Sequence, residues 1–400
     1  MKTLSNHRIT TFAFIFVTLF VAVFLTSCSP KTDTRQESDN SATAKPANEP
    51  TGDELYIDNN IAVQKPLARG NFVVFPLTAK KMKSIGDFMT LDEAAETKSV
   101  VVSEIGENAA QVDTLTVENK SDKPLFLLSG EICYGGKQNR IIRHSMVISP
   151  GQKMEVPVRC VEQGRWSGGH SDFMALKKAN APAGVRQAAQ QKSQSQQSTW
   201  QEVEKNLKSF SKDSSTRSLT EAVADPEIQN ESKKYFEDTL TALTGNERVV
   251  GIVIAVNGRI IGSDVFSSHE LFKRYAEKLL NSYALEALIR KTEKTAGTET
   301  TMAQVCDYLL RTKDGKKEDV IDNGPYKVSR VVNGNQNTLR LEMENVGELH
   351  ENSFETNSSD DQDTAHPPSD GYQRQNGPDD PYYPEEDTQQ QQNQSSSPLC

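Results

Sequence analysis

The sequence predicts one α+β domain between two polar ends, and three observations predict it. Short apolar runs separated by turn residues fill residues 60–165, which is typical of antiparallel strands. Apolar residues then recur at helical spacing between 180 and 245, and an apolar hairpin and helix follow at 249–290. We therefore expect a mostly antiparallel β portion, a helical insert, and a late β-hairpin and long helix that pack back on it.

The β portion is predicted from apolar runs and their alternation. Residues 72–77, FVVFPL, indicate a buried strand, and residues 99–105 a second one. Residues 112–117 and 124–128 flank a polar turn, so we expect them to pair as a hairpin. Residues 154–160 place Met, Val, Val and Cys on one face, as a half-buried strand requires.

The helical insert and the elements after it carry end signals. An apolar stripe in 185–211 predicts one or two helices, and Ser218-Leu219-Thr220-Glu221 resembles a capping box. Asn257-Gly258 within the apolar stretch 249–262 is a hairpin signal. Ser and His at 267–269 precede a long apolar-striped helix, and 305–347 holds only weaker strand signals.

The N-terminus is typical of an exported lipoprotein. Lys2 and Arg8 precede the apolar run 12–25, which is shorter than the roughly 20 residues of a membrane span. Leu25-Thr26-Ser27-Cys28 matches the cleavage site before a lipidated cysteine. We expect a signal peptide over 1–27, lipid on Cys28, and a flexible tether over 28–59. The predicted location is the periplasm or cell surface, on the cell membrane or the outer membrane.

Charge is concentrated at the C-terminus. The 400-residue chain has a net charge of −10, and residues 351–400 hold eleven acidic residues against Arg374, so residues 1–350 are close to neutral. We expect the domain to span residues 60–350 and the acidic, Gln-rich segment 351–400 to be disordered. Such a segment could bind a protein partner. The sequence lacks the stripe of basic residues that would indicate nucleic-acid binding.

Cysteine and histidine spacing indicates neither a metal nor a cofactor. The five cysteines include no close CxxC pair, and the six histidines show no paired spacing. Outside the cytoplasm a disulfide between Cys133 and Cys160 is an open possibility, beside the alternative of buried thiols.

Two polar blocks follow apolar strands and form the candidate ligand site. Gly135 and Gly136 supply flexible backbone that an anion can approach, and the second block follows the next alternating strand. The candidate ligand-binding residues are Lys137, Gln138, Asn139, Arg140, Arg165 and Trp166. Neighbouring strands would bring them to one rim, suited to a phosphate-bearing nucleotide or an ADP-ribose-like molecule. The alternative is a turn stabilised by structural ion pairs.

Three functions remain open on the residues alone. The first is a binding module of the cell envelope with a polar pocket. The second is a hydrolase or transferase acting on an ADP-ribose-like or phosphate-bearing substrate, with Glu131 or Glu162 as acid or base. The third is a scaffold for a protein partner.

Several segments resemble the ARG and Rhodanese-Phosphatase-superfamily-associated Protein domain family. The segments are GEICYGGKQNR, VPVRCVEQGRW, Arg186, Trp200 and VVGIVIAVNGRIIGSDVFSSHELF, within residues 60–350. The motif positions are Gly130, Glu131, Gly136, Lys137, Gln138, Asn139, Arg140, Cys160, Glu162, Arg165 and Trp166. The family name implies an indirect link to NAD or ADP-ribose metabolism, and its own chemistry is unassigned.

Overall fold

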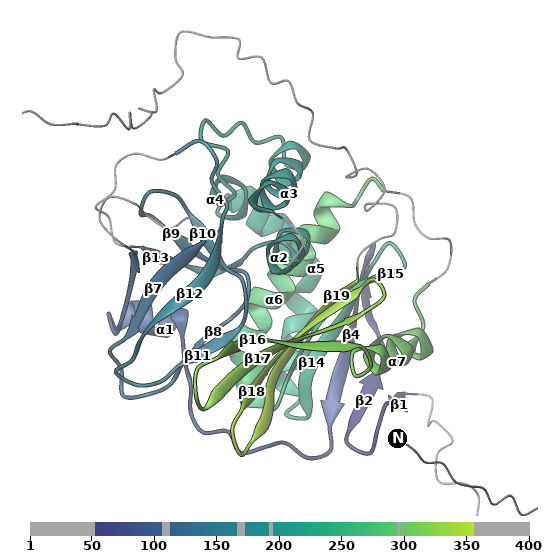
Figure 1. Cartoon of the computed structure of the whole chain (residues 1–400). Coiled ribbons are helices and arrows are strands. Elements are labelled where there is room, and N and C mark those ends of the chain that lie inside the picture. The colour runs from purple at the N-terminus through teal and green to yellow at the C-terminus, as the bar shows by residue number, and fades with distance from the viewer. Residues whose placement is uncertain are drawn as a thin grey trace, which may run out of the picture. The chain divides into compact units, whose positions relative to one another are not determined.

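The computed structural model describes residues 53–105, 113–165, 173–191, 195–293, 297 and 299–355 (Figure 1). The predicted signal peptide, Cys28, Trp166 and the tail after residue 355 lie outside the described residues. Within the described part, helices and mostly antiparallel strands confirm the α+β class. The first strand, at Glu54–Tyr56, lies inside the segment that we expected to act as a tether.

The largest sheet joins the beginning of the domain to its end. Its ten strands are all antiparallel to their neighbours. In spatial order they are β1 (Glu54–Tyr56), β2 (Ile61–Gln64), β4 (Phe72–Ala79), β14 (Val249–Val256), β15 (Arg259–Phe266), β19 (Gly347–Glu355), β18 (Gln336–Met343), β17 (Tyr326–Asn333) and β16 (Lys316–Asp322), with β3 (Leu67–Arg69) beside β4. The predicted hairpin is confirmed as β14 and β15, and Asn257 and Gly258 at its turn both have positive φ.

Helices cover both faces of the central strands β4 and β14. Phe72, Val74, Ile252 and Ile254 pack with α6 (His269–Ile289) and α5 (Pro226–Gly245) in one core cluster. The alternate residues Phe75, Leu77, Val253 and Ala255 pack with α7 (Met302–Arg311) in another. Because successive side chains of a strand point to opposite faces, a strand covered on both faces is apolar throughout. This explains the unbroken apolar run at 249–256.

Two smaller sheets lie beside the large one. The six-stranded sheet contains β13 (Met174–Asn180), β9 (Glu131–Tyr134), β10 (Arg140–Ile142), β12 (Lys153–Cys160), β7 (Thr114–Asn119) and β6 (Val100–Glu104), in that order. The three-stranded sheet contains β11 (Met146–Ile148), β8 (Leu125–Leu127) and β5 (Met89–Thr90), and β5 runs parallel to β8. Helix α1 (Leu91–Glu96) follows β5 and begins with a capping box at Thr90.

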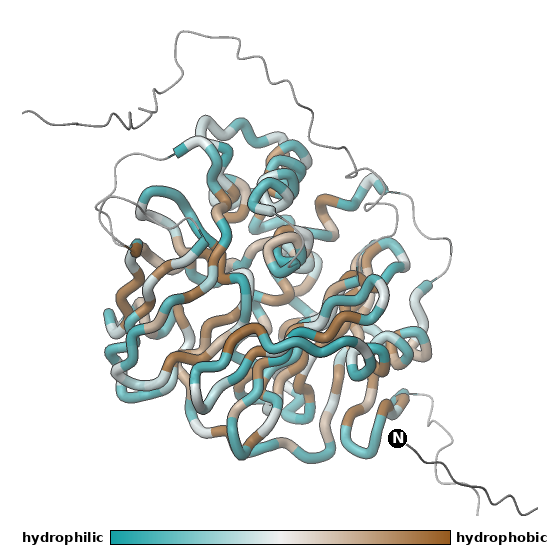
Figure 2. Tube along the Cα trace, viewed as in Figure 1, coloured by the Kyte–Doolittle hydropathy of each residue, from teal (hydrophilic) through white to brown (hydrophobic). Residues whose placement is uncertain are grey.

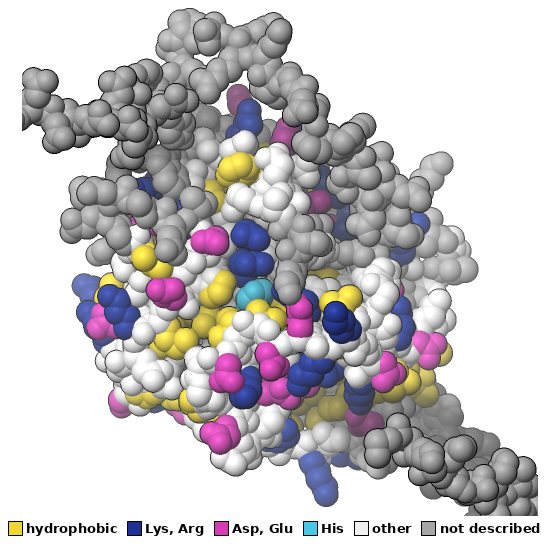
Figure 3. All heavy atoms as spheres, in the orientation of Figure 1, with side chains coloured by type: hydrophobic (Ala, Val, Ile, Leu, Met, Phe, Trp, Pro, Cys, Tyr) yellow, Lys and Arg dark blue, Asp and Glu magenta, His cyan; other side chains and the backbone are white. Residues whose placement is uncertain are grey.

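The predicted helical insert is confirmed as four helices. They are α2 (Ala183–Gln190), α3 (Gln196–Ser209), α4 (Thr220–Val223) and α5. Val185, Val203, Leu207 and Val223 form a core cluster with Ile132 and Ile141 of the six-stranded sheet. Figure 2 shows brown, apolar residues along the strands of the large sheet and teal, hydrophilic ones in many of the connecting loops. Figure 3 shows acidic and basic side chains interspersed over one face of the molecule.

The structure corrects three local predictions. Residues 112–128 are not a hairpin, because β7 pairs with β6 and β12 whereas β8 pairs with β11 and β5. All three residues of β8 are buried, with Phe126 in one core cluster and Leu125 and Leu127 in another, so β8 fits between two cores. No side chain caps α4, and Ser218 has another role. Helix α7 lies where we expected only weak strands.

Candidate functional site

The first polar block forms the connection between β9 and β10. Gly135 has φ of 119° and Gly136 has φ of 52°, in the left-handed region that favours glycine. A Cβ atom on Gly136 would lie 2.2 Å from Cζ of Phe173. The two glycines therefore let the chain turn tightly and let the Phe173 ring pack directly on the backbone.

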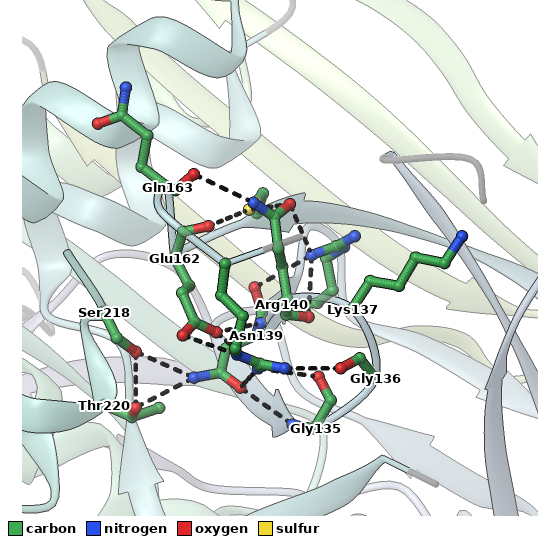
Figure 4. Close-up of polar contacts among 12 residues, drawn as sticks. Gly135, Gly136, Lys137, Asn139, Arg140, Glu162, Gln163, Ser218 and Thr220 are labelled. Atoms are coloured by element: carbon green, nitrogen blue, oxygen red, sulfur yellow. Dashed lines mark hydrogen bonds and ion pairs between the residues drawn. The ribbon is translucent and has the colours of Figure 1, made fainter. Parts of the chain in front are cut away.

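Arg165 of the second block reaches into the first block and holds it. Its Nη1 donates to the carbonyl oxygen of Gly136 at 2.7 Å, and its Nη2 donates to Oδ1 of Asn139 at 3.2 Å. Nε and Nη2 also bind the two carboxylate oxygens of Glu162, at 2.9 and 2.7 Å. The two blocks therefore meet in space through one guanidinium. Figure 4 shows Asn139 of the first block and Glu162 of the second side by side.

Asn139 lies at the centre of this arrangement. Its Oδ1 accepts from the backbone N–H of Gly135 at 3.0 Å, and its own N–H donates to Glu162 Oε2 at 3.0 Å. Its Nδ2 donates to the hydroxyl oxygens of Ser218 and Thr220, at 3.0 and 3.1 Å. We call the following residues the two-motif cluster: Gly135, Gly136, Gln138, Asn139, Arg140, Cys160, Glu162, Arg165, Ser218 and Thr220.

Arg140 is fully buried and incompletely hydrogen-bonded. Its Nη1 donates to the Gln138 carbonyl oxygen at 2.9 Å, and its Nη2 lies 3.9 Å from Oε1 of Glu104. Arg140 Nε and Nη2 and Glu104 Oε2 make no hydrogen bond with the described residues. A buried donor without a partner costs roughly 1–3 kcal/mol, so this end of the cluster has unused hydrogen-bonding capacity.

Cys160 is a buried thiol and does not form a disulfide with Cys133. Both are free, and each is the cross-strand neighbour of Arg140 from opposite sides, on β12 and β9. Two strand spacings amount to about 10 Å, beyond the roughly 7 Å that a disulfide can bridge. Burial raises the pKa of Cys160, whose Sγ donates to Gln138 Oε1 and to the Glu162 carbonyl oxygen, both at 3.0 Å.

The two candidate acid–base glutamates lie in different surroundings. Burial opposes ionisation of Glu162, but Arg165 and the Asn139 N–H outweigh it and hold its pKa below the ordinary value. Burial raises the pKa of Glu131, which is 1% exposed. Glu131 accepts from Lys278 Nζ at 2.5 Å and from the Leu128 N–H at 2.8 Å. Both carboxylates thus have their hydrogen-bonding partners within the protein.

The remaining candidates divide between the cluster and its edge. Gln138 is buried, and its Nε2 donates to the Gln163 carbonyl oxygen at 3.3 Å. Lys137 extends away from the hydrogen-bonded centre (Figure 4). Its backbone N–H donates to Glu104 Oε1 at 3.1 Å. Trp166 lies outside the described residues. Ser218, Thr220 and Glu104 were not predicted, because their contacts depend on chain pairing that no local motif encodes.

A second buried polar group was also missed by the sequence reasoning. Asp264 on β15 accepts from Arg186 Nη2 at 2.8 Å, Tyr283 Oη at 2.7 Å, and Asn352 Nδ2 at 3.0 Å. His350 Nε2 lies 3.2 Å from Asp264 Oδ1. Burial alone would raise the pKa of Asp264, but Arg186 and the other donors hold it below its usual range. The available signal was a lone aspartate inside an apolar strand.

The described ranges hold neither a cluster of metal-ligating side chains nor a helix suited to span a membrane. Among residues 53–355, as far as they are described, no three His, Cys, Asp or Glu side chains come together as metal ligands would. No helix in the described part of the chain combines the length and apolarity of a membrane crossing.

The fold and the cluster define an α+β domain whose polar residues are tied into buried networks. The chain belongs to the ARG and Rhodanese-Phosphatase-superfamily-associated Protein domain family, which it matches over residues 60–353. No curated protein and no solved structure matches it. The match covers both motif blocks, Arg186 and Asp264.

Proposed function

We propose that the chain is an exported lipoprotein anchored through Cys28, and that its domain binds a small anionic ligand at the two-motif cluster. The anchor rests on the basic start, the short apolar run and Leu25-Thr26-Ser27-Cys28. The ligand site rests on the meeting of the two blocks. A phosphate-bearing or ADP-ribose-like molecule is the ligand class that suits this composition.

The guanidinium of Arg140 carries the binding proposal. It is 0% exposed, and two of its nitrogens have no hydrogen bond to the described residues. A guanidinium holds its charge at any physiological pH, and phosphate or carboxylate oxygens match its geometry. An anion that binds Nε and Nη2 would complete the hydrogen bonding of Arg140, and it would displace the carboxylate of Glu104, whose Oε1 lies 3.9 Å from Nη2. Since Arg140 is enclosed, binding requires local movement of the residues around it.

The geometry supports binding over catalysis. A general acid or base must lie within hydrogen-bonding reach of the proton that it transfers. Glu162 uses both oxygens on Arg165 and Asn139, and Glu131 is enclosed with Lys278. The raised pKa of Cys160 disfavours the thiolate that nucleophilic catalysis needs. We therefore place a binding module ahead of a hydrolase or transferase.

Ligand-dependent thermal stability tests the binding proposal. The full chain would be heated with inorganic phosphate, AMP and ADP-ribose at several concentrations. A ligand at about 100 times its Kd stabilises the folded state by about 2.7 kcal/mol, enough to raise Tm by several degrees. We expect at least one anion to do so, with an affinity at least tenfold lower in Arg140→Lys.

Two further variants separate loss of binding from loss of folding. Arg217→Ala removes an arginine at the edge of the cluster whose Nη1 donates to Gln163 Oε1 at 2.9 Å, and it should bind normally. Lys137→Ala removes a partly exposed cation from the same block and should also weaken binding. This variant provides the test if Arg140→Lys does not fold. Absence of any shift in the wild-type chain, or equal shifts in wild type and a folded Arg140→Lys, would contradict the proposal.

Labelling with a fatty-acid analogue tests the anchor. The wild-type chain should incorporate the label and partition with membranes, whereas Cys28→Ala should do neither. Cys400→Ala, which removes the cysteine at the opposite end of the chain, is the matched control and should be labelled like wild type. Equal labelling of Cys28→Ala and wild type would exclude lipid on Cys28.

A further inference from the structure

A second candidate site lies on the face of the large sheet that α7 covers. It is a pocket of about 390 Å³ beside the C-terminal end of α7, within the usual size range of small-molecule sites. Its apolar lining comes from Ile57, Ile61, Leu77, Val265 and Leu309. Its polar lining comes from Asp58, Thr312, Lys313, Arg340, Glu348 and Glu351. In Figure 1, α7 lies beside β1 and β2.

The pairing register of the sheet explains the floor of this pocket. Leu77 on β4 pairs with Gly251 on β14, and Gly251 pairs with Val265 on β15. Val265 in turn pairs with Glu351, and Glu351 with Arg340. Directly paired residues have side chains on the same face, so this row runs from apolar to charged across the sheet. Gly251 has no side chain, and a Cβ atom added there would stand 2.6 Å from the Asp264 carbonyl oxygen and 2.8 Å from Val265 Cα, so β15 packs closely against it. Leu77 and Val265 supply the apolar floor of the pocket.

The charges in the lining do not balance. Lys313 Nζ binds Asp58 Oδ2 at 3.0 Å, which pairs those two residues. Among the lining residues, Arg340 serves two carboxylates, with its Nε 2.7 Å from Glu351 Oε2 and 3.4 Å from Glu348 Oε2. One carboxylate is therefore in surplus.

Two further observations favour a positive ligand. The last carbonyl groups of a helix carry partial negative charge, and Leu309 and Thr312 place that end of α7 at the pocket. A cation already lies at this end, because Arg340 Nη2 donates to the Thr312 carbonyl oxygen at 2.7 Å. Glu348 is 41% exposed, so a ligand can contact its carboxylate directly.

We propose that this pocket binds a small organic cation, with its ammonium group at Glu348 and its aliphatic part against Leu77, Val265 and Leu309. The ammonium would pair with Glu348, which shares Arg340 with Glu351. The aliphatic part would lie on the apolar floor that Leu77 and Val265 form. This site is separate from the two-motif cluster and does not depend on the function proposed for it.

The ionisation of Glu348 makes the site sensitive to pH. Partial burial raises the pKa of Glu348 to about 7, and the neighbouring carboxylates Glu351 and Glu342 act in the same direction. Arg340 and Lys83 act against them. A primary alkylamine stays protonated well above neutral pH, as the lysine side chain does. Its binding should therefore tighten as pH rises from 5 to 8.

Pentylammonium chloride is a suitable probe, with 1-pentanol and sodium pentanoate as matched controls. Binding to the purified full chain would be measured by calorimetry and by shifts in two-dimensional NMR spectra. We expect pentylammonium to bind at pH 8 with a Kd on the order of 1 mM, because so small a ligand makes few contacts. Both controls should bind at least tenfold more weakly, and pentylammonium itself should bind at least tenfold more weakly at pH 5, where Glu348 is protonated.

Variants locate the site. Glu348→Gln should weaken pentylammonium at least tenfold, whereas Glu342→Gln, which changes a neighbouring glutamate outside the pocket lining, should stay within twofold of wild type. Ile57→Trp adds bulk to the lining and should also block binding, which keeps the test decisive if Glu348→Gln does not fold. No binding of pentylammonium, equal binding of 1-pentanol, preference for pentanoate, or full binding by a folded Glu348→Gln would each overturn the proposal.

Discussion

Gly130 lies directly against the side chain of Arg186. A Cβ atom on Gly130 would stand 2.6 Å from Arg186 Cγ, and Gly130 itself has φ of 88°. Arg186 continues from there to Asp264, with its Nη2 2.8 Å from Oδ1. This contact links the first residue of the GEICYGG motif to a buried ion pair in the large sheet.

Gly130→Ala should therefore destabilise the domain more than the same substitution at another glycine with positive φ. Gly151→Ala is the control, because Gly151 has φ of 69° and a Cβ atom added there would meet no other atom within 4 Å. Both variants carry the cost of a positive φ, but only Gly130→Ala also crowds buried atoms. We expect Gly130→Ala to lower the free energy of unfolding by about 2 kcal/mol more than Gly151→Ala. Equal urea midpoints for the two variants would contradict this account.

Asp264→Asn should be among the most destabilising isosteric changes in the chain. Arg186 is 0% exposed, and the substitution leaves its charge without a counterion. Breaking a buried pair in this way costs about 3–5 kcal/mol. Asp238→Asn, at a side chain that is 95% exposed, should change stability by less than about 0.5 kcal/mol. Urea unfolding followed by circular dichroism measures both, and similar values for the two variants would contradict a central role for Asp264.

The sequence was most informative where a signal depends on neighbouring residues. The hairpin at Asn257-Gly258 and the start of α6 at Ser268 follow from turn and capping chemistry, and both are confirmed. The hairpin expected at 112–128 was wrong, because a polar turn shows where the chain reverses but not which strand becomes the partner. The alternating burial of β7 and the complete burial of β8 reflect different sheets.

The same limit applies to the candidate site. Polar residues at 137–140 and 162–165 could be selected from composition, and the structure brings the two blocks together through Arg165. Ser218 and Thr220 could not be assigned to it, since they join Asn139 from about 80 residues further along the chain. Ser218 looked like a helix cap because its local sequence fits that role equally well.

Arg165→Ala should loosen the two-motif cluster. The substitution leaves Glu162, whose side chain is 4% exposed, without its charged partner. We expect the free energy of unfolding to fall by about 2–3 kcal/mol, compared with less than about 0.5 kcal/mol for Arg217→Ala. Urea unfolding at pH 7 checks the difference. A loss below about 1 kcal/mol would mean that the guanidinium adds little to the hydrogen bonds that remain.

The stability of the domain should depend on pH through the ionisation of Glu162. The folded-state pKa of Glu162 lies below the ordinary value of 4.5, so its contribution is present above that value and is lost as pH falls through the lowered pKa. Wild type should therefore be more stable than Glu162→Gln at pH 7, and the difference should shrink below pH 4.5. Urea midpoints at a series of pH values would show it, and a constant difference would contradict it.

Glu348→Gln should stabilise the domain at alkaline pH but not at acidic pH. The pKa of Glu348 is raised from 4.5 to about 7, so the folded state binds more protons than the unfolded state between these values. Stability therefore falls as pH rises through this window, and a glutamine, which does not titrate, avoids the loss. Because the side chain is 41% exposed, solvent screening limits the gain to about 1 kcal/mol at pH 8. Urea midpoints should coincide near pH 4.5 and separate above pH 6. A Glu348→Gln variant less stable than wild type at pH 8 would mean that the ion pair with Arg340 outweighs the cost of burying the charge.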